Sequence, residues 1–91
     1  MAHQAVLTWT ASVDPVQGYN VYRGSAAGQE TTKVNGSTLV TGTTYTDSPL
    51  PPGAVFYVVR SVENGVESVN SNEVSAVILP AAPTALAITA S

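Results

Sequence analysis

The sequence predicts an all-β domain in which short strands form a sandwich or a barrel. Short runs rich in Val, Thr and Tyr recur at regular spacing, and Gly- or Pro-containing turns separate them. No window shows a 3.6-residue apolar period free of Gly, Pro or β-branched runs, so no helix is expected. One run, Leu50 to Val62 (LPPGAVFYVVRSV), is apolar enough to be the central strand on which the others pack.

Length and composition describe one small folded domain and exclude several partners. The 91 residues are 44% hydrophobic and 10% charged, which is unlike a disordered chain. The net charge is −3, and the three basic residues are scattered, which argues against nucleic acid and anionic membrane surfaces. The chain has no cysteine, so neither a disulfide nor a thiolate metal site is expected. No apolar run approaches the ~20 residues of a membrane span, and no membrane insertion is expected.

Alternation predicts the first strands. Ala5 to Thr10 (AVLTWT) places Leu7 and Trp9 on one face, as a half-buried strand does. An Asp-Pro turn follows, and Tyr19 to Arg23 (YNVYR) is expected as the second strand. Polar Glu30 to Asn35 (ETTKVN) suits a sheet edge, where its Lys discourages further pairing.

The second half of the chain is organised by its turns. Thr43 to Asp47 is expected as a strand that leads into the Pro51-Pro52-Gly53 corner, which opens the central strand. If Arg60 faces solvent, alternation turns alternate residues of this strand inward, beginning at Val55. Asn-Gly after the strand predicts a tight hairpin, with Ser71 to Leu79 returning. The expected core consists of Leu7, Trp9, Tyr19, Val21, Tyr45, Tyr57 and Val59.

No catalytic constellation is recognisable, and we expect neither an enzyme nor a cofactor. The single histidine, His3, lies in the first four residues, which are interpreted as a leader or cloning remnant. The acids are dispersed. Asp14, Glu63 and Glu67 could share one end of the domain as a weak cation site, although solvated loop charges are the favoured interpretation. An outward Tyr22 could stack on a sugar or anchor a protein partner, or be an ordinary surface aromatic.

Several segments together resemble a fibronectin type III domain of bacterial secreted proteins. They are AVLTWTAS, GYNVYRG, TTYTDSPLPPG, YVVRSVENGVES and SNEVSAVIL, which follow one another in the family's order within residues 5–79. The resemblance implies an immunoglobulin-like sandwich with Trp9 between the sheets. The family usually ties its corner with a tyrosine hydroxyl near the start of the central strand. Val55 and Phe56, the candidates here, have none, and Tyr57 is the available substitute.

A second departure concerns the family's first strand, which precedes the Trp-bearing strand. Residues 1–4 are too short for it, whereas residues 80–91 contain a linker and a segment with the expected alternation. That segment consists of Thr84, Ala85, Leu86, Ala87, Ile88, Thr89 and Ala90. Two interpretations stay open: the strand completes a neighbouring domain or identical copy, or the chain boundary is displaced by one strand.

The resemblance therefore implies a non-enzymatic extracellular module, secreted or at the cell surface, that spaces domains or contributes to adhesion. Its expected partners are neighbouring domains, with a protein or carbohydrate surface as a further ligand. The alternative is a self-assembling subunit that forms head-to-tail filaments by donating residues 84–90. Fold by itself does not fix function.

Overall fold

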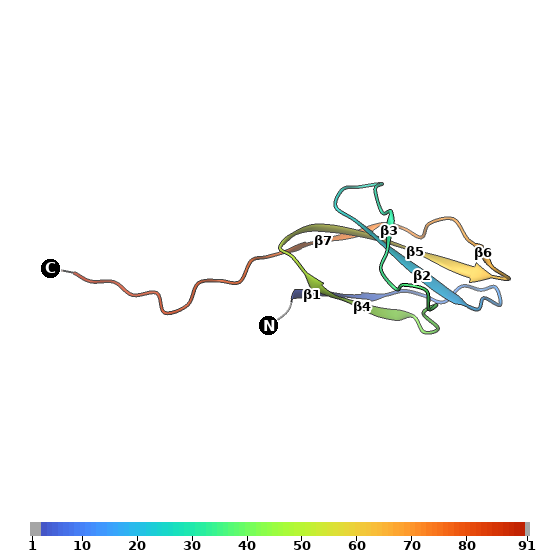
Figure 1. Ribbon diagram of the computed structural model, residues 1–91, viewed down its shortest axis with the longest axis horizontal. Coiled ribbons are helices and arrows are strands. Elements are labelled where there is room, and N and C mark those ends of the chain that lie inside the picture. The colour runs from blue at the N-terminus through green and yellow to red at the C-terminus, as the bar shows by residue number, and fades with distance from the viewer. Residues whose placement is uncertain (1–2, 91) are drawn as a thin grey trace.

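The computed structural model describes residues 3–90, which form two β-sheets and a long extended tail (Figure 1). Within these residues, no helix is long and apolar enough to cross a membrane. The strands are β1 (His3–Thr8), β2 (Gly18–Gly24), β3 (Thr32–Lys33), β4 (Thr44–Leu50), β5 (Gly53–Glu63), β6 (Val66–Glu67) and β7 (Val74–Ile78).

The two sheets face each other as a sandwich, which confirms the predicted all-β class. β1 pairs with β4 in one sheet, and the other sheet has the order β3-β2-β5-β6, with β7 also pairing with β5. Every strand pair is antiparallel. The apolar β5 is central because β2 covers one of its edges, and β6 and then β7 cover the other.

Turn chemistry sets the ends of β5. Gly53 begins it with a φ of 134°, a conformation that side-chain-bearing residues rarely adopt. At its other end Asn64 and Gly65 have φ values of 53° and 79°, which is the two-residue hairpin geometry that the Asn-Gly pair predicts. Glu63 then pairs with Val66 across the turn.

The core lies between the sheets, and both sheets contribute to it. Its buried centre is Leu7, Val21, Leu50, Val55 and Tyr57. Tyr19 is also buried, whereas Trp9, Tyr45 and Val59 are half-buried and pack against this centre. Leu50, the last residue of β4, belongs to this centre and was not among the residues expected in the core.

Several expected elements have different bounds. β1 begins at His3, inside the segment interpreted as a leader, and ends at Thr8, so Trp9 lies just beyond the strand. β3 is reduced to two residues, because Asn35 turns its side chain back to accept the Val21 N–H at 2.8 Å. β4 runs on to Leu50, whereas the returning strand β7 shrinks to Val74–Ile78.

The segment expected as a strand at residues 84–90 is not one in this structure. It extends away from the body without ladder pairing, and Leu86 and Ile88 are 96% and 93% exposed (Figure 1). A strand needs a partner for its main-chain groups, and here the segment has none among the described residues.

The chain enters and leaves the body at the same end. His3 pairs with Leu50, and Ile78 pairs with Gly53, which follows Leu50 after a short corner (Figure 1). The opposite end carries the loop after β1, the segment before β4 and the Asn64-Gly65 turn. We call this the distal end.

Candidate functional site

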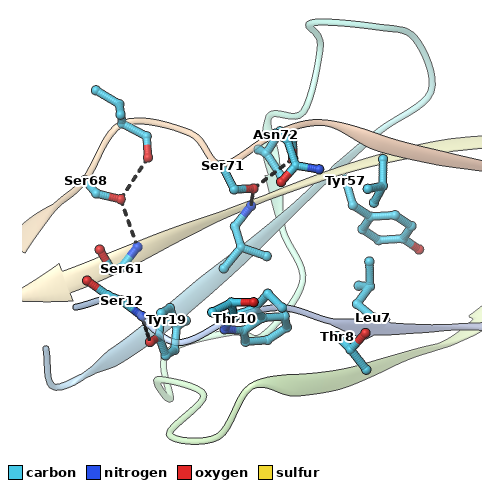
Figure 2. Close-up of a pocket in the computed structure, with 15 residues that line it drawn as sticks. Leu7, Thr8, Thr10, Ser12, Tyr19, Tyr57, Ser61, Ser68, Ser71 and Asn72 are labelled. Carbon is cyan, nitrogen blue, oxygen red and sulfur yellow. Dashed lines mark hydrogen bonds between the residues drawn. The ribbon is translucent and has the colours of Figure 1, made fainter. Parts of the chain in front are cut away.

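A groove of about 420 Å³ lies beside β1. Leu7 and Trp9 line it from the β1 side. The loop between β6 and β7, with Ser68 and Ser71, lines it from the other side (Figure 2). Val74, the first residue of β7, continues this side. Tyr19 and Tyr57 contribute to its lining from the larger sheet. The groove therefore lies between the two sheets, along the side where β1 pairs with no strand of residues 3–90.

Trp9 forms the distal part of the groove wall. Its ring meets the Tyr19 ring edge-on, with 5.4 Å between centroids and 65° between planes. The Tyr19 hydroxyl accepts the main-chain N–H of Ser12 at 2.8 Å, which holds the loop after β1 against the wall (Figure 2). The indole Nε1–H of Trp9 is buried and has no acceptor among residues 3–90. A buried donor without an acceptor costs free energy of folding, so the hydrogen-bonding groups of this wall are less completely paired than those of the rest of the core.

Two serines build the opposite wall. Ser68 and Ser71 each donate a main-chain N–H to β5, to the carbonyls of Ser61 and Val59 at 2.8 and 2.9 Å. Their hydroxyl oxygens accept the N–H groups of the same two residues at 3.0 and 2.9 Å (Figure 2). In the segment between β6 and β7, the serine side chains thus take the place of main-chain ladder bonds to β5. They explain why the returning strand, expected to begin at Ser71, begins only at Val74.

A partly buried ion pair joins the two sheets near the groove. The buried carboxylate of Asp47, on β4, accepts from the Tyr57 hydroxyl at 2.7 Å and from the Arg23 guanidinium at 2.8 Å. Arg23 and Tyr57 are cross-strand partners on β2 and β5. Burial first, and then the bond to Asp47, raises the pKa of Tyr57 above its usual value. Tyr57 thus connects the central strand to β4 through its hydroxyl.

The outer face of the larger sheet carries a second polar network. Glu67 accepts from the Tyr22 hydroxyl, from Asn20 at 2.8 Å and from Arg60 at 3.0 Å. Hydrogen bonds from Tyr22 and Asn20, followed by the bond and charge of Arg60, lower the pKa of Glu67 to about 2. The Arg60 guanidinium lies 4.4 Å from the centroid of the Tyr22 ring. Tyr22 does point outward, but Arg60 covers its ring, so it is a poor platform for a sugar.

The distal end brings the three expected acids around a shallow hollow without making a metal site. Asp14, Glu63 and Glu67 all line it. Glu67 is already held by Tyr22, Asn20 and Arg60, and within residues 3–90 no group of three His, Cys, Asp or Glu side chains is arranged to hold a metal ion. His3 lies in β1 at the other end of the domain.

One carboxyl pair was missed by the sequence analysis. Glu30 is buried, and its Oε2 has no partner among residues 3–90. A hydrogen bond shared with Glu73 raises the pKa of Glu30 and lowers that of Glu73, which also accepts the Gly28 N–H at 2.8 Å. The two glutamates lie far apart in sequence, so no local pattern could reveal the pair.

Comparison with solved structures identified a relative of high similarity. The chain is similar to a solved structure described as a Fn3-like protein from Clostridium thermocellum, with a TM-score of 0.73 and 35% sequence identity. The alignment covers 90% of this chain and 82% of that chain. Neither the family models nor the curated proteins gave a match.

Proposed function

The chain belongs to the Fn3-like family, and from this membership we propose that it serves as a non-enzymatic structural module. In this proposal it spaces or presents parts of a secreted or cell-surface protein. The observation that carries the proposal is that two of its carboxylates make structural hydrogen bonds between strands. Asp47 and Glu67 are held by strand-to-strand bonds that brace the sandwich.

The position of the two chain ends favours presentation over in-line spacing. Entry at His3 and exit after Ile78 lie at the same end, so an isolated body projects from its attachment. The distal loops then lie farthest from the attachment, where a protein or carbohydrate surface can reach them. The low share of charged residues, 10%, and the many Thr, Ser and Ala residues suit an extracellular location.

Label distances test this arrangement. The chain contains no cysteine, so fluorophore pairs can be placed through His3→Cys with Leu79→Cys, and Asn64→Cys with Leu79→Cys. We expect the first pair to give the higher transfer efficiency, and both to give single narrow distributions. Equal efficiencies, or a broad distribution for the second pair, would contradict a rigid projecting body. A hydrolase or transferase activity of the purified chain would contradict the non-enzymatic assignment.

A second candidate function is self-assembly into head-to-tail filaments. It is favoured by a specific combination: an edge of β1 that pairs with no strand in the described part of the chain, and an exposed apolar segment, residues 84–90. An open strand edge readily pairs with an extended segment of another chain.

A further inference from the structure

We propose that the free edge of β1 and the groove beside it form a strand-acceptor site, whose ligand is residues 84–90 of a second copy of the chain. The inference rests on the second candidate function, self-assembly, and it names the site, the ligand and the direction of binding. It does not depend on the presenting role, which concerns one copy.

The first argument is the hydrogen-bonding capacity of the β1 edge. The Trp9 N–H donates to the Thr43 carbonyl at 3.0 Å. In an antiparallel pair, alternate residues face the partner, so the main-chain groups of Leu7 also face β4 while those of Val6 and Thr8 face away. Among residues 3–90, β1 pairs only with β4. Its other edge therefore offers a row of N–H and C=O groups to an incoming strand.

The second argument is the apolar surface of the groove. Leu7, Trp9 and Tyr57 line it, and the opposite rim carries Val69 and Val74, which are 87% and 46% exposed. A strand laid along β1 would turn every second side chain toward this surface. The site thus demands an extended segment with apolar side chains at alternate positions.

Residues 84–90 meet this demand. Leu86 and Ile88 would share one face of an extended chain, and they are 96% and 93% exposed in this structure. Only small or polar residues separate and flank them, and residues 80–90 carry no charged side chain. No like-charge repulsion would therefore oppose pairing with β1, whose one titratable residue is His3.

Direction favours a second copy over the chain's own tail. An antiparallel ligand must enter at the Trp9 end of the groove, whereas the tail leaves the body at the His3 end (Figure 1). Leu79 to Pro83 spans at most ~18 Å, and β1 alone is roughly 20 Å long. The chain's own tail could therefore reach the groove only by reversing at Pro80–Pro83 and lying parallel to β1, unlike every pair in this fold.

Antiparallel donation also defines how copies would line up. The donor body lies beyond the Trp9 end of the acceptor, and the acceptor's own tail leaves from the opposite end. Each copy is then a donor at one end and an acceptor at the other. Such a head-to-tail contact propagates as an open array unless its rotation closes a ring.

Two complementary variants of the full chain test the proposal. Val6→Pro removes an N–H that faces the free edge, a position where an edge strand tolerates proline. Leu86→Asn with Ile88→Asn disables the donor segment by replacing its two apolar side chains, which are exposed in the monomer. Val6→Thr and Val13→Asn are the matched controls, since Val6 is 61% and Val13 100% exposed.

Sedimentation velocity then gives a distinctive pattern. We expect the unmodified chain and both controls to assemble with rising concentration, and each disabled variant to be monomeric. An equimolar mixture of the two disabled variants should form a dimer that does not grow, because it contains one intact edge and one intact segment. A mixture that remains monomeric would overturn the proposal, as would an unmodified chain that is monomeric at every concentration.

A second measurement tests the proposal if the Val6→Pro variant does not fold. A peptide of residues 80–90 is titrated into the Leu86→Asn/Ile88→Asn chain, and the emission of Trp9 in the groove wall is recorded. A saturable shift, absent with the doubly substituted peptide, supports the acceptor site. No shift overturns it. If the unmodified monomer already differs in Trp9 emission from the double variant at every dilution, the chain's own tail fills the groove and the second-copy assignment is wrong. Label distances in the double variant test the presenting role separately.

Discussion

Asp47 shows how a single buried carboxylate can connect the two sheets. Its Oδ2 accepts from Tyr57 on the central strand and from Arg23 on the neighbouring strand. Removing the Tyr57 hydroxyl would leave Asp47 with Arg23 as its remaining partner. We therefore expect Tyr57→Phe to lower the free energy of unfolding by about 1.5–3 kcal/mol, as for a hydrogen bond to a charged group. Urea denaturation measures this loss.

Tyr45→Phe is the matched control. Its hydroxyl donates to the neutral main-chain carbonyl of Val34 at 2.8 Å, and the residue is half-buried. This loss should be smaller, about 0.5–1.5 kcal/mol. If Tyr57→Phe costs no more than Tyr45→Phe, the Asp47 connection does not stabilise the sandwich as described.

Glu67 predicts a dependence of stability on acid. Because Tyr22, Asn20 and Arg60 lower its pKa to about 2 from a usual value of 4.5, the folded state favours the carboxylate. The resulting stability is present above the usual pKa and is lost as the pH falls toward about 2. The melting temperature of the unmodified chain should therefore fall more between about pH 6 and pH 3 than that of Glu67→Gln. Equal decreases in melting temperature would show that Glu67 does not contribute to the loss of stability in acid.

At the scale of elements, the sequence predicted those strands whose local pattern and burial agree. β5 was recognisable because its bounding turns and its apolar run lie next to one another in the chain. Tyr57 was named as the substitute for the family's corner tyrosine, and its hydroxyl does join β5 to β4 through Asp47.

Other elements depend on contacts that are distant in sequence. The returning strand begins at Val74 instead of Ser71 because the hydroxyls of Ser68 and Ser71 accept main-chain N–H groups of β5. Likewise, the buried Glu30 meets Glu73 only after folding. The alternation at residues 84–90 predicts a strand, but a strand forms only where a partner edge is present. That edge, on β1, is distant from the segment in the same molecule.

For the molecule as a whole, the resemblance to fibronectin type III domains is confirmed by the solved Fn3-like relative. The fold places an unpaired β1 edge and an apolar groove along one side of the body, and an exposed apolar segment beyond one end. The segment matches the groove in three ways. Its apolar side chains alternate, its main-chain groups are free to pair with the β1 edge, and it carries no charge that β1 would repel. We infer that one copy completes the next.

Amide hydrogen exchange across β1 tests this claim most directly, because it reports on each edge of the strand separately. The Leu7 amide faces β4 and should be protected at every concentration. The amides of Val6 and Thr8 face the free edge. They should exchange rapidly in the Leu86→Asn/Ile88→Asn chain and become protected in the unmodified chain as its concentration rises. Equally rapid exchange of Val6 and Thr8 in both proteins at high concentration would contradict strand donation.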